Sequence, residues 1–261
     1  MKRRRIDTLL AERGLAGSRT SAAASVRAGR VRIGADGPFA TKPGQMVRDD
    51  VELLLAEPPR YASRGGLKLE HALDALAVDV AGRSCLDVGA STGGFTDCLL
   101  KHGAERVIAL DVGRGQLDWR LRNDPRVEVV EGRNARELVP ADLAWAPELA
   151  TVDVSFISLA KVLAPIAAAL VPGGAVLALV KPQFELEPER VGRGGVVRSA
   201  EDRRESLRRA ASAAAAAGLA VSGFASSGLP GPKGNRETFI HCVRDGAPID
   251  DVEAAIEGVE P

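Results

Sequence analysis

Residues 83–96 read Arg-Ser-Cys-Leu-Asp-Val-Gly-Ala-Ser-Thr-Gly-Gly-Phe-Thr, and this stretch decides the fold class. The apolar run near its start predicts a strand over 83–88. A glycine-rich turn follows, and we expect a helix to begin near Gly94. Because Gly89 and Gly93 lack a Cβ atom, the backbone can turn tightly there and approach a ligand closely. Strand, turn and helix N-terminus together predict the ligand-binding corner of a doubly wound α/β sheet.

The ligand expected at this corner is an adenosine-containing cofactor. Asp111 ends the next apolar run, 107–110, and an acid at that strand tip can accept hydrogen bonds from both ribose hydroxyls. A dinucleotide site would instead need Gly-x-Gly-x-x-Gly, with a pyrophosphate on the helix N-terminus. Asp87, directly before the first glycine, would repel a pyrophosphate but could face the ammonium group of a methionine moiety. These residues favour S-adenosylmethionine over NAD, and a glycine turn without any ligand is the remaining alternative.

The larger part of the chain alternates short apolar strands with helices, which predicts a parallel sheet. We expect strands at 83–88, 106–111, 127–130, 149–154 and 174–181, with a final pair near 219–225 and 237–243. Helices are expected at 67–76 and, rich in alanine, at 200–217. The predicted fold is a Rossmann-like α/β fold with seven strands and a terminal hairpin, preceded by a small α+β domain. This arrangement resembles the usual architecture of S-adenosylmethionine-dependent methyltransferases.

The charge of the chain is unevenly distributed, although its 261 residues carry no net charge. Residues 1–64 hold 13 Lys and Arg against 7 Asp and Glu, a balance of +6, so residues 65–261 carry −6. A basic module joined to an acidic one predicts an anionic partner that the first part recruits. The three cysteines fit no zinc pattern and no disulfide framework, so neither a metal nor a disulfide is expected.

No stretch of the sequence predicts a membrane segment or a secretion signal. The basic residues 1–8 lead into no apolar segment. The longest apolar stretch, around 167–180, is broken by Pro172-Gly173-Gly174. We therefore expect a cytoplasmic protein with free thiols and no membrane partner.

Residues 1–56 predict a small domain with a basic surface. Apolar residues at helical spacing indicate a first helix that Gly14 ends, and Ser18 can cap a second helix from Arg19 to about Ala28. Arginines on or near these helices could neutralise several phosphates. The candidate RNA contacts are Arg4, Arg13, Arg19, Arg27, Arg30 and Arg32. A solvated basic face without a ligand is the alternative interpretation.

This module resembles the S4 RNA-binding domain. The resemblance is carried by Arg4, Asp7, Leu9-Leu10, Arg13-Gly14-Leu15, Ser18-Arg19 and residues 26–31. It implies binding of structured RNA, commonly ribosomal RNA, through shape and phosphate contacts. Residues 57–66, with two prolines and two glycines, are expected to form a linker. Residues 67–246 would then form the large domain, and residues 247–261 an acidic tail with a short helix.

Four charged residues stand where strand tips and adjoining elements of the predicted sheet should meet. Lys68 lies on the helix that enters the domain, and Asp153 ends the fourth strand. Lys181 ends the fifth strand, and Glu237 begins the last one. The carboxyl ends of the strands form the ligand crevice of an open α/β sheet, so these side chains are candidates for catalysis. The alternative is that they form ordinary surface ion pairs.

The order Lys, Asp, Lys, Glu resembles the catalytic set of the ribose 2′-O-methyltransferases related to FtsJ. Longer motifs resemble the TlyA (hemolysin A) family and lie at 61–69, 87–96, 153–159, 181–185 and 231–235. With the S4-like module in front, the resemblance covers nearly the whole chain. It implies 2′-O-methylation of cytidine in ribosomal RNA, with S-adenosylmethionine as donor and Lys181 as general base. Asp153 and Glu237 would orient the two ammonium groups.

The same resemblance implies a set of cofactor contacts. The methionine part would be lined by Gly89, Ala90, Ser91 and Gly93, and Phe95 stands where the FtsJ relatives have an aromatic residue. Asp111 would hold the ribose hydroxyls. Asn134 stands where many relatives have an aspartate near the adenine, and its amide can still read the adenine edge.

Three other functions are weighed against this one. A non-catalytic RNA-binding or ribosome-assembly factor could keep the fold, but the intact set of four charged residues argues against it. The family name suggests a membrane-active hemolysin, for which the sequence offers no amphipathic apolar helix and no secretion signal. A pseudouridine synthase with an S4 domain would need a different fold from the one that the glycine turn indicates.

Overall fold

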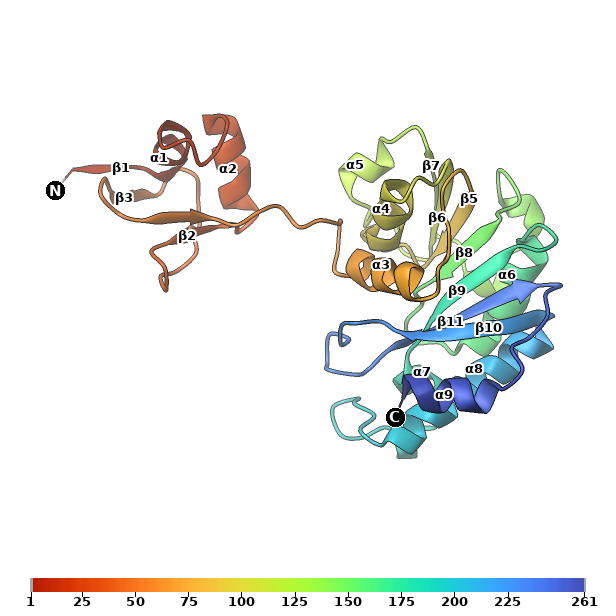
Figure 1. The fold of residues 1–261 in the computed structure, drawn as a ribbon. Coiled ribbons are helices and arrows are strands. Elements are labelled where there is room, and N and C mark those ends of the chain that lie inside the picture. The colour runs from red at the N-terminus through yellow and green to blue at the C-terminus, as the bar shows by residue number, and fades with distance from the viewer. Residues whose placement is uncertain (1, 261) are drawn as a thin grey trace. The chain divides into compact units, whose positions relative to one another are not determined.

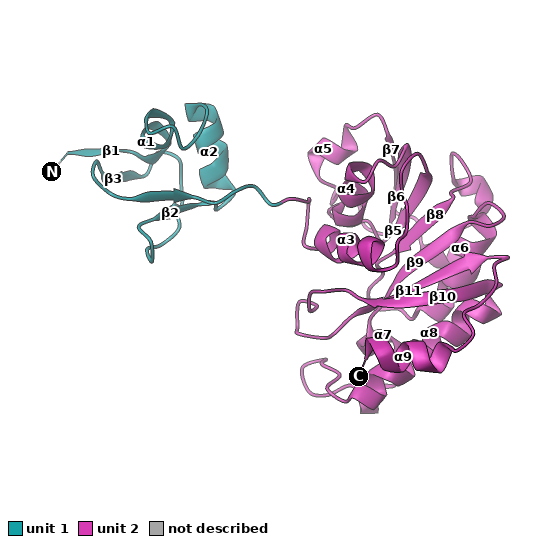
Figure 2. Cartoon of the chain, viewed as in Figure 1, with its two compact units in different colours: residues 1–59 teal, residues 60–261 magenta. Residues whose placement is uncertain are grey.

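The computed structural model describes residues 2–260 and divides the chain into two compact units, residues 1–59 and 60–261 (Figure 2). Each unit encloses hydrophobic side chains of its own. The predicted end of the small domain, at residue 56, lies close to the end of the first unit.

The first unit consists of two short helices and two small antiparallel sheets (Figure 1). Its elements are β1 (Arg3–Arg5), α1 (Ile6–Glu12), α2 (Arg19–Arg27), β2 (Val31–Ile33), β3 (Met46–Arg48) and β4 (Leu53–Leu55). β1 pairs with β3, and β2 pairs with β4. Ser18 caps α2 as predicted, because its hydroxyl accepts a hydrogen bond from the Ser21 N–H at 3.1 Å.

The second unit contains the predicted seven-stranded sheet. Its parallel strands are β5 (Ser84–Val88), β6 (Arg106–Asp111), β7 (Val127–Glu131), β8 (Leu149–Val152) and β9 (Ala175–Val180). The antiparallel hairpin of β10 (Leu219–Ser226) and β11 (Thr238–Arg244) completes it. The strands lie in the order β10-β11-β9-β8-β5-β6-β7. The order reverses between β5 and β8, so the carboxyl ends of these two neighbours open the crevice where such sheets bind ligands.

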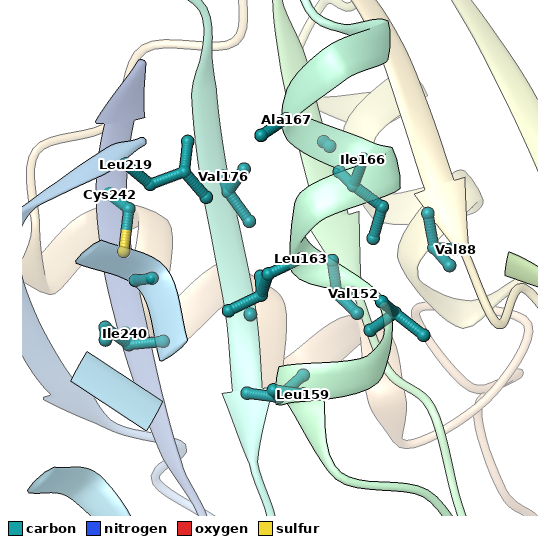
Figure 3. Close-up of a cluster of buried hydrophobic side chains, with 14 of the residues drawn as sticks. Val88, Val152, Leu159, Leu163, Ile166, Ala167, Val176, Leu219, Ile240 and Cys242 are labelled. Carbon is teal, nitrogen blue, oxygen red and sulfur yellow. The ribbon is translucent and has the colours of Figure 1, made fainter. Parts of the chain in front are cut away.

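Helices cover both faces of this sheet (Figure 1). α3 (Gly65–Ala75), α4 (Gly94–Lys101) and α5 (Trp119–Arg122) pack on one face. α6 (Leu163–Ala169), α8 (Ala200–Ala216) and α9 (Val252–Val259) pack on the other, where Figure 3 shows Leu163 and Ile166 of α6 above Val152 and Val176. Because side chains alternate along a strand, β5 to β9 and β11 contribute to both cores, whereas the side chains of β10 join the core under α6, α8 and α9. Among residues 2–260, we find no helix with the length and apolar character needed to cross a bilayer.

The linker predicted at 57–66 is wrong over most of its length. The second unit begins at residue 60, and α3 begins at Gly65. Tyr61 is buried in the core, and its hydroxyl donates to Glu70 Oε1 at 3.0 Å. A Cβ atom at Gly66 would lie 2.3 Å from Tyr61 Cγ. The glycines therefore permit close packing at the entrance to α3.

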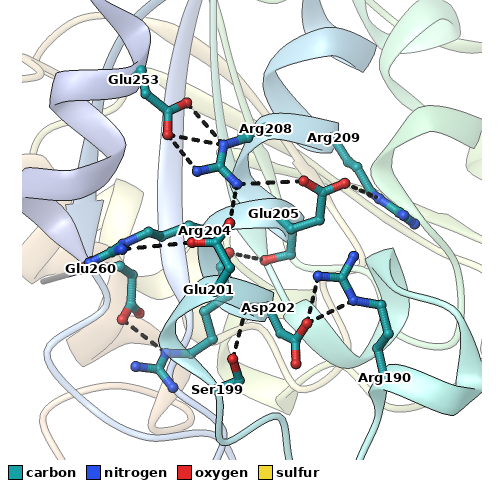
Figure 4. Close-up of polar contacts among 12 residues, drawn as sticks. Arg190, Ser199, Glu201, Asp202, Arg204, Glu205, Arg208, Arg209, Glu253 and Glu260 are labelled. Carbon is teal, nitrogen blue, oxygen red and sulfur yellow. Dashed lines mark hydrogen bonds and ion pairs between the residues drawn. The ribbon is translucent and has the colours of Figure 1, made fainter.

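The C-terminal segment expected to form an acidic tail with a short helix, 247–261, contains α9, which packs onto the second unit. Ile256 of α9 is fully buried. The buried carboxylate of Glu260 accepts a hydrogen bond from Arg203 Nε at 2.9 Å, and its backbone carbonyl accepts one from Arg204. Figure 4 shows the surrounding ion pairs, in which Arg208 of α8 joins Glu253 of α9 at 2.5 Å.

We expect Glu260→Ala to destabilise the second unit by about 3 kcal/mol, because it leaves the buried guanidinium of Arg203 without its carboxylate. Urea unfolding followed by circular dichroism measures the change. Glu257→Ala is the matched control, since Glu257 lies on α9, which Glu260 directly follows, but is exposed. Equal midpoints for the two variants would show that the buried pair contributes nothing to stability.

Candidate active site

Two adjoining cavities lie at the carboxyl ends of the parallel strands. The larger, of about 790 Å³, is lined by all four candidate catalytic residues: Lys68, Asp153, Lys181 and Glu237. The smaller, of about 420 Å³, is lined by Asp111 and Asn134. Gly89, Ser91 and Asp153 line both. These volumes are typical of small-molecule sites, which commonly measure about 300–1,000 Å³.

The glycine turn holds the tips of β5 and β8 close together. Gly89 has a φ of +85°, and a Cβ atom there would lie 2.5 Å from the Asp153 carbonyl oxygen. Gly93 has a φ of +90°, and its Cβ would lie 2.3 Å from Leu121 Cδ1. Any other residue at either position would be strained and would collide with its neighbour. The turn is therefore fixed between the end of β8 and α5.

Asp111 joins the turn after β5 to the loop after β6. Its Oδ2 accepts from the Ser91 N–H at 2.8 Å, and its Oδ1 accepts from the Gly113 N–H at 2.6 Å. The side chain remains partly exposed and lines the smaller cavity. A carboxylate oxygen can accept more than one hydrogen bond, so Asp111 can still receive ligand hydroxyls. This geometry fits an adenosine-bearing cofactor in the smaller cavity.

The remaining predicted cofactor residues surround the same turn. Asn134 accepts from the Arg136 N–H at 3.1 Å, which orients its amide beside the smaller cavity. Ala90 and Phe95 line the larger cavity, and Phe95 packs against Phe239 with their ring centroids 5.8 Å apart. Gly93 lines neither cavity and acts through the shape of the turn.

Asp87 does not take the predicted place beside a methionine ammonium group, because its side chain points away from both cavities. It is only 1% exposed and faces α4. Its Oδ2 accepts from the Thr96 N–H at 2.9 Å and from the Thr96 hydroxyl at 2.7 Å. Burial raises the pKa of this carboxyl to about 7, against the opposing effect of these hydrogen bonds. Its position in β5 explains the correction, since alternate side chains of a strand face opposite sides of the sheet.

The four candidate catalytic residues form two lysine–carboxylate pairs. Lys68 Nζ lies 2.5 Å from Glu237 Oε2, and the Glu237 side chain is only 1% exposed. Lys181 Nζ lies 2.6 Å from Asp153 Oδ1 and donates to Ser155 Oγ at 2.9 Å. Opposite charges compensate within each pair, which is the condition for holding ionised groups in a largely buried cavity.

Local sequence places each member of these pairs. Lys181 follows the apolar strand β9, and Pro182 begins α7 (Pro182–Glu185), so the strand cannot continue and the lysine stays at the rim. A Cβ atom at Gly231 would lie 2.3 Å from Glu237 Oε1. Glycine at 231 therefore leaves the space that Glu237 occupies beside Lys68.

Glu185 and Phe156 shape the cavity, although the sequence analysis assigned them no role. The buried Glu185 carboxylate accepts from Ser158 Oγ at 2.6 Å and from the Leu159 N–H at 2.9 Å, so it ties the loop after β8 to α7. Burial raises the pKa of Glu185. Phe156 is 91% exposed at the cavity mouth, has a φ of +63°, and lies 5.3 Å from Phe184 between ring centroids. Membership of the motifs at 153–159 and 181–185 was the only signal for either residue.

Most of the arginines proposed to contact RNA make contacts within the first unit. Arg4 pairs with Glu12 at 2.5 Å, and Arg19 with Asp7 at 3.3 Å. Arg13 and Arg30 donate to backbone carbonyls, and Arg32 lies 4.9 Å from the Phe39 ring. Arg27 is exposed and, among the described residues, has no recorded polar partner. Arg27 therefore presents the freest guanidinium group of this set.

The described residues contain no cluster of three or more His, Cys, Asp or Glu side chains arranged to hold a metal ion. The three cysteines are free and buried. Burial raises the pKa of Cys85, Cys98 and Cys242 to about 12. Their thiols therefore stay protonated at neutral pH and act as core side chains.

Asp87 should make the unfolding free energy fall as pH rises from about 4 to about 8. Its pKa is raised to about 7 in the folded protein, so between these values the folded state binds a proton that the unfolded state has lost. Asp87→Asn cannot titrate and should remove this part of the fall. Urea unfolding of both proteins across this range measures it. Parallel pH profiles would show that the pKa of Asp87 is not raised in the folded protein.

Comparisons with known proteins agree with this geometry. The model of a family described as FtsJ-like methyltransferase matches residues 61–244. The chain is 48% identical over 241 residues to the 16S/23S rRNA (cytidine-2′-O)-methyltransferase TlyA of Mycobacterium tuberculosis, covering 92% of this chain and 89% of the relative. It is 46% identical over 242 residues to YqxC of Bacillus subtilis, a candidate rRNA methyltransferase, covering 92% and 85%.

One solved structure extends the similarity to both units. A protein of Streptococcus thermophilus, described as a candidate hemolysin, is 42% identical with a TM-score of 0.75 and covers 99% of this chain and 94% of its own. The family match and these sequence identities establish the family to which the chain belongs. The chain belongs to the TlyA/hemolysin A group of FtsJ-like methyltransferases, enzymes that use S-adenosylmethionine.

Proposed function

We propose that this protein methylates the ribose 2′-hydroxyl of a cytidine in ribosomal RNA. The observation that carries the proposal is the pair of lysine–carboxylate contacts in a cavity that adjoins the Asp111 cavity. The name of the Mycobacterium tuberculosis relative supports cytidine and ribosomal RNA as the substrate. S-adenosylmethionine, when bound, supplies an electrophilic methyl group.

The cofactor would lie across the tips of β5 and β6. Asp111 would accept hydrogen bonds from its ribose hydroxyls, and Asn134 would contact the adenine edge. The backbone at Gly89 and Ser91, which line both cavities, would face the methionine part. This placement leaves the rest of the larger cavity for the target nucleotide.

Lys181 would be the general base. A ribose hydroxyl is a poor nucleophile, and a side chain that takes its proton in the transition state typically contributes about 100-fold to 10,000-fold in rate. Lys181 in its neutral form would accept the proton at Nζ. Asp153 Oδ1, at 2.6 Å, would stabilise the ammonium group that forms, and Ser155 Oγ, at 2.9 Å, would fix its direction.

Lys68 would act through the positive charge of its ammonium group. Its ammonium group is held by Glu237 Oε2 at 2.5 Å and faces the same cavity, so it can stabilise negative charge on the attacking oxygen. Phe156 would supply a stacking surface for the target base, since it is an exposed aromatic side chain at the cavity mouth. Together these residues would hold the hydroxyl in place, which itself lowers the barrier.

The first unit would bind ribosomal RNA as an S4-like domain. Its basic residues and its two-helix architecture support this assignment. The second unit, which is acidic as a whole, would contribute the chemistry. Affinity and catalysis would therefore be separable properties of the chain.

Lys181→Ala should reduce methyl transfer at least about 100-fold, because it removes the base. Transfer from a labelled donor to isolated 30S and 50S ribosomal subunits measures this. Donor affinity, measured by calorimetry, should stay unchanged. Asp111→Ala is the complementary variant. It should weaken donor binding, because the contact with the ribose hydroxyls is lost. Activity of Lys181→Ala within tenfold of the wild type would exclude Lys181 as the base.

Removal of residues 1–59 should leave a folded second unit that binds S-adenosylmethionine but associates weakly with ribosomal subunits. The second unit has its own core, and the removed unit carries the basic surface. Loss of phosphate contacts should also flatten the dependence of affinity on salt. Binding to 30S and 50S subunits at several salt concentrations measures both effects. Equal affinities and equal salt slopes would place RNA recognition in the second unit.

A further inference from the structure

The larger cavity is lined by four cationic side chains, and only two of them are compensated. Lys68 and Lys181 each have a carboxylate partner. Arg64 and Lys233 line the same cavity, and within residues 2–260 neither forms an ion pair. Most arginines of this acidic unit do have a carboxylate partner, as Figure 4 illustrates for α8. The cavity mouth therefore carries an excess of positive charge.

Lys233 lies on a firmly held turn. The Gly231 N–H donates to the Asn235 carbonyl at 2.8 Å, and Gly234 has a φ of +94°. Asn235 is only 2% exposed. Its Oδ1 accepts from the Val197 N–H at 2.8 Å, and its Nδ2 donates to the Gly195 carbonyl at 2.7 Å. The buried amide thus fastens the turn to the neighbouring loop, and Lys233 projects from a fixed support.

Arg64 is linked to the same turn from the other side. It lies at the start of α3, and its Nη2 donates to the Pro230 carbonyl at 3.3 Å. The turn leads into β11. In the sheet, β9 and β8 separate β11 from β5 and β6. Asp111 ends β6 and Asn134 follows β7, so the two cations lie on the opposite side of the switch point from the adenosine cavity. Their side of the cavity is the one left for the target nucleotide.

We infer that Arg64 and Lys233 bind a phosphate of the RNA backbone next to the target ribose. In RNA the 2′-hydroxyl and the 3′-phosphate are carried by adjacent ribose carbons, so a ribose that reaches Lys181 brings a phosphate to the same cavity. A guanidinium and an ammonium without carboxylate partners are suited to such an anion. This inference rests on the proposed function, because it takes the occupant of the cavity to be RNA.

The test compares Arg64→Gln, Lys233→Gln and Lys233→Arg with the wild type in the full chain. Arg83→Gln is the control, since Arg83 directly precedes β5, at the amino ends of the parallel strands, and lines neither cavity. The measurements are affinity for 30S and 50S subunits against salt, KM and kcat for methyl transfer, and donor affinity by calorimetry. Thermal unfolding verifies that each variant is folded.

Each Gln variant should lower the salt slope of binding by about one and raise the KM for the modified subunit roughly tenfold. Lys233→Arg keeps the charge and should restore both values, and Arg83→Gln should match the wild type. Donor affinity should not change in any variant. Unchanged slopes and KM in both Gln variants would overturn the inference, and so would weakened donor binding, which would assign the cations to the donor carboxylate. A wild type inactive on both subunits would refute the proposed function, while the salt slopes would still decide whether the phosphate site exists.

Discussion

The close approach of β5 and β8 at their carboxyl ends is the constraint on which the site depends. Only glycine fits at position 89, because the Asp153 carbonyl occupies the place of a side chain. This contact makes Asp153 a wall of both cavities and brings the cavity lined by Asp111 next to the lysine pairs. The reversal of strand order creates the crevice. The absence of a Cβ atom at Gly89 sets how closely the tips of β5 and β8 approach each other across it.

The electrostatics of the site follow from how unequally its two pairs are exposed. Glu237 is almost completely buried beside Lys68, whereas Asp153 keeps part of its side chain in contact with solvent. Loss of either member of a buried pair would leave the other charge uncompensated, which is strongly destabilising. The more open pair leaves Asp153 and Lys181 accessible from the larger cavity.

Much of the fold was predictable because its signals are local. Apolar runs located the seven strands, the glycine turn located the corner after β5, and Pro182 explained why Lys181 stands at a strand tip. Contacts between distant segments were not predictable in this way. Glu260 lies 57 positions from Arg203, and nothing near either residue indicates that they meet. Composition was misleading at residues 60–66, where the same glycines that suggest a linker permit tight packing around Tyr61.

The ion pair between Lys68 and Glu237 joins residues that are 169 positions apart in the chain. Contacts over such distances form late, because the intervening chain must first be ordered. The glycine turn and Asp111, by contrast, lie within one continuous stretch that includes β5 and β6. On the ribosome, a chain under synthesis can therefore build the corner around Gly89 and Asp111 long before Glu237, which directly precedes β11, is made. The ion pair between Lys68 and Glu237 consequently forms only after nearly all of the sheet has been made.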